Sequence, residues 1–175
     1  MPEGPTPLRF GLAVARQLGR PPTIEFVVAV LCRYGWPAVI RNSPVDARGN
    51  PNPNLYYLSC PYLRREISRL EDRGEIARLQ QRLADDAALA EAVRAAQRRH
   101  EAEWEADAGS PVKPVPPGPR IAAASGDLLL KCLHAQFACY LVHRDYAIGE
   151  LIAGELADIW CGDERCRRYL HEPAT

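Results

Sequence analysis

The hydrophobic pattern of the chain changes near residue 60, from short apolar runs to apolar positions at helical spacing. Residues 24–32 and 36–41 are apolar and rich in β-branched side chains, and residues 55–59 form a third such run. Runs of this length bounded by Gly, Pro and Asn are typical of strands joined by turns. The pattern therefore predicts a small antiparallel sheet near the N-terminus.

Helical spacing of apolar residues marks the remaining elements. Residues 6–18 predict a short helix before the sheet, with Thr6 as its N-cap. Residues 61–107 predict a helical arm after the sheet. Residues 127–144 predict a further helix, and a last helix begins near Ile148.

The helical arm contains internal start and stop signals. Gly74 ends or interrupts its first helix. Asp85 or Asp86 is placed to cap the next helix, on which Trp104 faces inward. Charges of both signs are mixed along the arm, which favours a solvated helical hairpin with ion pairs on its surface. A surface that binds a protein partner through residues 64–107 remains the alternative interpretation.

These elements predict a single α+β domain over residues 1–175. It is mostly helical, with a small N-terminal antiparallel sheet and a long helical hairpin. A chain of 175 residues is long enough to bury one hydrophobic core. The expected segments are an N-terminal helix and sheet over 6–60, the arm over 61–107, a proline-rich linker over 109–120 and C-terminal helices over 125–170.

Composition and charge exclude several classes of function. The chain has 22 basic and 22 acidic residues and no basic cluster, so nothing indicates nucleic-acid binding. No apolar run reaches the roughly 18 residues of a membrane span. Without a Gly-rich phosphate loop, no nucleotide cofactor is indicated. The first residues lack the basic and apolar regions of a signal peptide, so we expect a cytoplasmic protein.

The six cysteines are the main chemical feature of the sequence. Thiols of cytoplasmic proteins are kept reduced, so we expect no disulfide framework. Each cysteine is then a buried small hydrophobe, a metal ligand or a reactive thiol. The sequence has no C-x-x-C pair that would assign two of them at once.

The helix expected over 127–144 carries the densest group of candidate ligands. On one continuous helix, four side chains share a face: Cys132, Gln136, Cys139 and His143. Side chains at i and i+4 can bind one metal ion, and further ligands then come from elsewhere in the fold. On this helix His134 points about 200° away from Cys132. The alternative is that Cys132 and Cys139 are inert core residues and that His143 interacts only with the helix dipole.

Cys60 is the first candidate ligand from outside this helix. It directly precedes Pro61, at the expected N-terminus of the arm, where backbone N–H groups and the helix dipole favour a thiolate. A thiolate in this position is either a metal ligand or a nucleophile. In the second case His134 or His143 would act as the base.

The other three cysteines carry less information. Cys32 belongs to the fragment C-R-Y-G, which resembles half of a zinc knuckle, and we count it as a further candidate ligand. Cys161 and Cys166 are spaced as C-x4-C. A lone spacing of this kind is little evidence for a metal, so we expect both to be inert.

Three segments, in this order, resemble the bacterial domain-of-unknown-function 501 family: Gln17–Pro22, Leu55–Pro61 and Lys131–Ala135. The resemblance spans roughly residues 10–166 and implies no assigned activity. Relatives in this family often have His at the positions of Gln136 and Cys139. A Cys/His/His pattern at these spacings looks like metal coordination, and Cys139 preserves a ligand where Gln136 does not.

With the resemblance added, the leading hypothesis is a zinc ion or an iron–sulfur cluster bound by Cys60, Cys132 and Cys139. Cys32 or His143 would be the fourth ligand. Two alternatives stay open: a non-enzymatic partner-binding or scaffold protein with inert buried cysteines, and a thiol enzyme that uses Cys60. The leading hypothesis requires the three sulfur atoms to converge within about 4 Å of one another.

Overall fold

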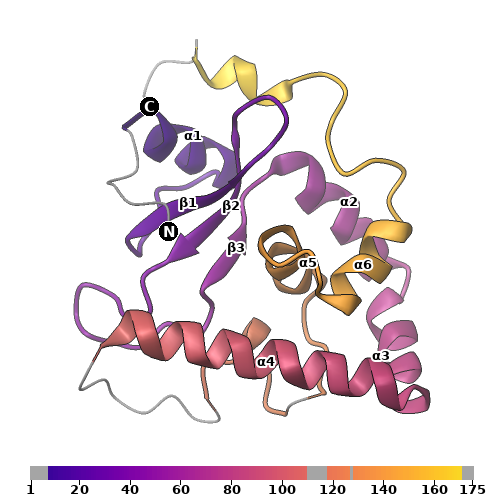
Figure 1. The fold of residues 1–175 in the computed structure, drawn as a ribbon. Coiled ribbons are helices and arrows are strands. Elements are labelled where there is room, and N and C mark those ends of the chain that lie inside the picture. The colour runs from indigo at the N-terminus through magenta and orange to yellow at the C-terminus, as the bar shows by residue number, and fades with distance from the viewer. Residues whose placement is uncertain (1–7, 110–117, 127, 171–175) are drawn as a thin grey trace.

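The computed structural model describes residues 8–109, 118–126 and 128–170, and it confirms an α+β fold with a small antiparallel sheet near the N-terminus (Figure 1). The strands are β1 (Phe26–Leu31), β2 (Pro37–Asn42) and β3 (Tyr56–Leu58). The helices are α1 (Leu8–Leu18), α2 (Pro61–Asp72), α3 (Glu75–Asp85), α4 (Ala87–Ala108), α5 (Leu133–Val142) and α6 (Ala147–Gly154), with short 3-10 helices η1 (Ile121–Ala123) and η2 (Arg165–Leu170). No helix of the described part is long and apolar enough to cross a membrane.

The sheet has the order β1-β2-β3, with both pairs antiparallel. Gly35, at φ +76°, lets the chain reverse between β1 and β2, because this backbone conformation is strained for other residues. Helix α1 lies on one side of the sheet and α5 on the other (Figure 1). The expected N-cap Thr6 lies outside the described residues, as does most of the proline-rich segment 109–120.

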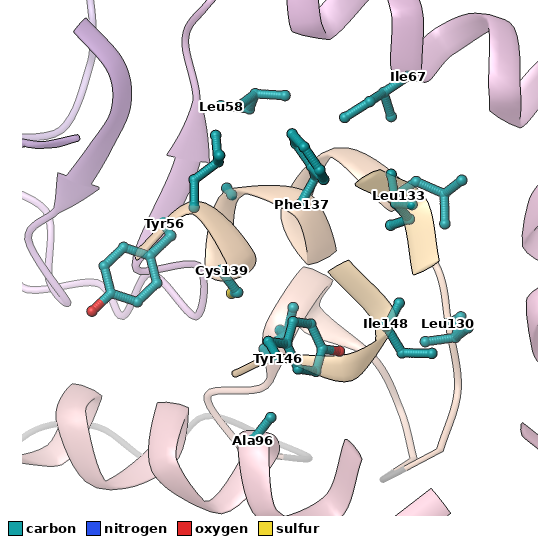
Figure 2. Packing of buried hydrophobic residues seen from close by; sticks show 14 of the residues in the cluster. Tyr56, Leu58, Ile67, Ala96, Leu130, Leu133, Phe137, Cys139, Tyr146 and Ile148 are labelled. Carbon is teal, nitrogen blue, oxygen red and sulfur yellow. The ribbon is translucent and has the colours of Figure 1, made fainter. Parts of the chain in front are cut away.

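Helix α5 occupies the centre of the hydrophobic core. It packs against β3, α6 and α2, and Phe137 is completely buried among them (Figure 2). A helix surrounded in this way buries most of its circumference, which explains why its sequence is apolar nearly all round. Its buried residues are Leu133, Gln136, Phe137, Ala138, Cys139 and Leu141.

The helical arm forms three helices, α2, α3 and α4. Gly74 adopts φ +82° between α2 and α3, as its sequence position predicts. Asp86 accepts a hydrogen bond from the backbone N–H of Leu89 at 2.9 Å and so caps α4. Trp104 faces inward and donates from Nε1 to the carbonyl of Asn52 at 2.7 Å. The apolar faces of all three helices join the common core, so the arm is part of this core.

The helix predicted over 127–144 is shorter than expected and begins only at Leu133. Gln80 of α3 holds the segment before Leu133 in a non-helical conformation. The Gln80 side chain accepts a hydrogen bond from the N–H of Leu130 and donates one to the carbonyl of Leu128, each at 2.9 Å. These bonds satisfy backbone groups that a helix would otherwise pair. The last helix is also shorter and ends at Gly154.

Candidate functional site

The structure distributes the predicted ligands among three places. Cys132 lies beside His134, Cys139 lies near His143, and Cys60 lies near Cys32. Among the described residues, the only group of three ligand atoms within 4.8 Å of one another is Glu71, Cys132 and His134. The sulfur atoms of Cys60, Cys132 and Cys139 therefore do not meet, and the expected common centre is not formed.

The expected stripe of ligands on one helix face is wrong for a local reason. Cys132 is the N-cap of α5, with extended backbone angles of φ −153° and ψ 118°, and His143 is the C-cap. Both residues thus lie outside the regular helix, at its opposite ends. The bend at Cys132 brings its sulfur to 3.8 Å from Nδ1 of His134, the residue that a continuous helix would point away.

Glu71 of α2 completes the group. Its Oε1 lies 3.2 Å from Nδ1 of His134 and accepts a hydrogen bond from the N–H of Leu133 at 2.7 Å. This N–H is one of the unpaired donors at the start of α5, so the carboxylate also caps that helix. Glu71 and His134 are about one quarter exposed, so the group can be reached from solvent.

The second nitrogen of the imidazole determines what the first can do. Nε2 of His134 lies 3.0 Å from the backbone carbonyl of Arg64. A carbonyl oxygen only accepts, so Nε2 carries a proton and donates it. In the neutral ring Nδ1 then presents its lone pair to Glu71 and Cys132. An N–H donated to a backbone carbonyl is also the usual support of a metal-binding histidine.

Nδ1 of His134 and the Glu71 carboxylate would then be two hydrogen-bond acceptors 3.2 Å apart, which repel each other. A proton or a metal cation between them removes this repulsion. One candidate is a proton, and the pKa of His134 is indeed raised. Burial alone would lower it, and contacts with Cys132, the Arg64 carbonyl and Glu71 more than offset burial. The other candidate is a metal ion, for which all three side chains offer ligand atoms.

Two of the three ligand separations in the group are close to those around a shared tetrahedral ion, and the third, between Glu71 and Cys132, is below 4.8 Å. Zinc bonds of about 2.0 Å to nitrogen and oxygen and about 2.3 Å to sulfur put neighbouring N and O ligands about 3.3 Å apart and N and S about 3.5 Å apart. The observed separations are 3.2 Å from Nδ1 to Oε1 and 3.8 Å from Nδ1 to Sγ. The residues present therefore fit a zinc ion with three protein ligands and one open position.

A cavity of about 680 Å³ lies next to this group, and Cys132 and His134 are part of its wall. Three basic residues also line it, Arg64, Arg65 and Lys131, of which Arg65 is paired with Glu66. Its volume is in the range of small-molecule sites, and its basic lining favours an anionic ligand. A larger cavity of about 1080 Å³ beside α1 and β1 has no thiol or imidazole among its lining residues.

Cys139 and His143 belong to the core and its edge. Cys139 points toward α4 between Tyr56 and Tyr146 (Figure 2), and burial raises the pKa of its thiol. His143 pairs through Nε2 with Oε1 of Glu103 at 3.0 Å. The Tyr56 hydroxyl donates to the other oxygen of this carboxylate at 2.7 Å. These contacts account for both predicted ligands without a metal.

Cys60 lies in a different part of the molecule, where burial raises the pKa of its thiol to about 11. A thiol in this state is a poor nucleophile at neutral pH. His134 lies in the Glu71 and Cys132 group and His143 beside Glu103, so neither of the two bases proposed for Cys60 is placed to serve it.

Sequence reasoning missed Glu71 as a member of the site. Glu71 lies on a charged, exposed-looking stretch of α2, 62 residues before Leu133, and no local pattern distinguishes it from its neighbours. The sequence does indicate Cys132, as a metal ligand together with Cys60 and Cys139, and His134, as a base for Cys60.

Comparison with known proteins places the chain in one family. The family model described as "Protein of unknown function (DUF501)" matches residues 28–154, which is more than half of the chain. The match runs from within β1 to the end of α6 and includes all three residues of the group around His134. No curated protein and no solved structure matches the chain.

Proposed function

The chain belongs to the DUF501 family. We propose that it is a zinc-binding protein whose Glu71, Cys132 and His134 hold one ion beside a cavity for a small anionic molecule. The convergence of three ligand atoms from α2 and the start of α5 carries this proposal. Thiolate, imidazole and carboxylate groups are each common zinc ligands.

The number of protein ligands, three, favours a site that binds a substrate or another small molecule at the metal ion. Structural zinc sites use four protein ligands, whereas sites that leave one position open use three. The cavity beside Cys132 and His134 gives a small molecule access to that position. A zinc ion bound there would supply Lewis acidity and a bound water of lowered pKa. Arg64, Arg65 and Lys131 would attract an anionic group.

A cysteine-dependent triad is the competing interpretation of the same residues. In such a triad the nucleophile and the orienting carboxylate contact opposite nitrogens of the histidine. Here Cys132 and Glu71 both approach Nδ1, and Nε2 is taken by the Arg64 carbonyl. This arrangement matches ligands around one ion and does not match a relay through the ring.

Metal analysis of the purified chain tests the proposal. We expect Cys132→Ser, His134→Gln and Glu71→Gln each to lose one equivalent of zinc per chain, measured by elemental mass spectrometry after purification without chelators. Glu71→Gln retains an oxygen acceptor for the Leu133 N–H, so the start of α5 is kept while the charge is lost.

Matched residues outside the group serve as controls. Cys139→Ala and His143→Gln change the same residue types and should keep the zinc content of the unmodified chain. Circular dichroism of every variant shows whether it is folded. Folded Cys132, His134 and Glu71 variants with unchanged zinc content would overturn the proposal.

The cavity is tested with inorganic phosphate as the anionic probe. In the cobalt-substituted chain, phosphate that enters the open position changes the visible absorption of the ion. We expect Lys131→Gln to weaken phosphate binding about tenfold, the loss of one charge-assisted contact. Arg98→Gln, an exposed arginine of α4 away from the cavity, should bind as the unmodified chain does. Equal affinities for both variants would show that the cavity is not the anion site.

A further inference from the structure

Four of the six cysteines converge at a place distant from the Glu71 group. Cys32 follows β1, Cys60 precedes α2, and Cys161 and Cys166 come from the C-terminal segment. All four line one small enclosed cavity, together with Tyr34, Trp36, Pro37, Trp160 and Glu164. Segments separated by up to 134 positions are thus brought together around thiols.

All four thiols are free and shielded from solvent. Cys60, Cys161 and Cys166 are buried, and Cys32 is half-buried. Thiols gathered in this way are either protonated and inert or bound to a common ion that replaces their protons.

The first two cysteines are held by short structured turns. The N–H of Gly35 donates to the carbonyl of Cys32 at 2.9 Å, and the N–H of Cys32 donates to the carbonyl of Trp36 at 2.8 Å. Cys60 is the N-cap of α2, at the positive end of the helix dipole. This end of a helix favours a thiolate over a thiol.

The C-terminal pair is supplied with further N–H donors. Nε2 of buried Gln17 donates to Sγ of Cys166 at 3.4 Å. Nη2 of Arg33 donates to the carbonyl of Cys161 at 2.7 Å, and the Arg165 side chain lies beside the Cys161 thiol. The Gln17 amide thus contacts the sulfur of Cys166, and the Arg165 guanidinium lies beside that of Cys161, where its charge would favour a thiolate.

We propose that Cys32, Cys60, Cys161 and Cys166 form a second, structural zinc site that fastens the C-terminal segment to the sheet and to α2. Four cysteine ligands with no free position are the usual composition of structural zinc sites. This site is independent of the Glu71 group, since the two share no residue.

The space between the four cysteines is small, with a free volume of about 10 Å³. A single ion suits such a space better than an iron–sulfur cluster, which carries several additional atoms. In the structure no three of these sulfurs lie within 4.8 Å of one another, and a tetrahedral zinc site requires about 3.8 Å. Zinc binding would therefore have to draw the sulfurs closer together.

Zinc stoichiometry distinguishes the two proposed sites. We expect the unmodified chain, purified anaerobically, to contain two zinc ions, and the double variant Cys161→Ser, Cys166→Ser to contain one. Cys132→Ser should also contain one, and Cys139→Ala should contain two. A folded Cys161 and Cys166 variant that keeps two zinc ions would overturn this site, whereas an unchanged Cys132 variant would overturn only the Glu71 site. Iron and sulfide in place of zinc would overturn the assignment of the ion.

Alkylation of the unmodified chain gives a second measurement that needs no variant. We expect Cys32, Cys60, Cys161 and Cys166 to be protected in the zinc-loaded chain and to become alkylated together when a chelator is added, as followed by peptide mass spectrometry. Cys139, buried in the core, should stay protected in both states. Alkylation of the four that does not depend on zinc, or disulfides between them, would overturn the site.

Discussion

At the scale of single residues, the environment of a side chain decides its chemistry more than its type does. Cys139 and Cys132 were predicted in the same role, yet Cys139 is enclosed by the core and Cys132 stands at the end of a helix beside an imidazole. His134 and His143 likewise differ through their partners, a carboxylate with a thiol in one case and a carboxylate with a tyrosine in the other.

Glu103 gives a prediction about pH at this scale. Burial raises the pKa of its carboxyl, but hydrogen bonds from His143 and Tyr56 outweigh burial and lower that pKa overall. A carboxyl whose pKa is lower in the folded state stabilises the fold above its unfolded pKa of about 4.3 and loses this contribution as pH falls through its folded pKa. We therefore expect Glu103→Gln to be less stable than the unmodified chain at neutral pH, and the difference to shrink below about pH 4.

Urea unfolding of both chains between neutral and acidic pH measures that difference, and any effect of acid on bound metal is common to the two. Glu105→Gln, an exposed carboxylate of the same helix, is the control and should show a much smaller difference. A difference between Glu103→Gln and the unmodified chain that stays constant over this pH range would contradict the prediction.

At the scale of elements, α5 and α6 pack closely against each other in the core. A methyl group placed on Gly149 of α6 would lie 2.0 Å from Cβ of Tyr140 on α5, which is far inside van der Waals contact. The two helices approach this closely because the glycine has no side chain. The absence of a side chain here positions Tyr146 and Ile148 against the core (Figure 2).

We expect Gly149→Ala to destabilise the fold by about 2–3 kcal/mol, because the backbone of α6 would have to move away from α5. Gly154→Ala is the matched control, since open space surrounds that position, and it should change stability by less than about 1 kcal/mol. Thermal or urea unfolding of the two variants gives both values. Equal stabilities would mean that α6 can shift without loss.

At the scale of the whole molecule, the proposed four-cysteine site would join the ends of the fold. Residues 161–170 are joined to the rest of the structure by η2 packing on α1 and by hydrogen bonds. Arg16 donates to the Tyr169 carbonyl, Gln17 to the Cys166 sulfur and Arg33 to the Cys161 carbonyl. An ion shared by Cys32, Cys60 and the C-terminal cysteines would add a further connection. Stability of the whole chain would then depend on the free zinc concentration.

Chelation tests this dependence. We expect removal of zinc from the unmodified chain to lower its melting temperature by several degrees, and hydrogen exchange to increase first in residues 161–170, where few other contacts remain. If free zinc is initially present at about 100 times its dissociation constant, its removal lowers the free energy of unfolding by about 2.7 kcal/mol. The double variant Cys161→Ser, Cys166→Ser should respond much less. An unchanged melting temperature after verified zinc removal would contradict the prediction.

The sequence alone determined the elements and the family of this protein. Runs of β-branched residues predicted the strands, Gly74 and Asp86 marked helix boundaries, and the segments around Cys60 and Cys132 indicated the DUF501 family. Each of these signals depends on residues close together in the chain. The prediction of a helix over 127–144 was wrong for its first residues, because their conformation depends on a residue far away in the chain. Gln80 of α3 pairs with the backbone of Leu128 and Leu130.

Only the tertiary structure decided which of the predicted ligands meet. Glu71 reaches His134 because α2 packs against α5, and Cys60 approaches Cys166 instead of Cys132 because the C-terminal segment folds back toward the sheet. Ligand distances must be correct to a few tenths of an ångström, and chain reversals and packing set them over tens of residues. Local patterns therefore identified residues with possible ligand atoms, and long-range packing determined which of these residues lie together.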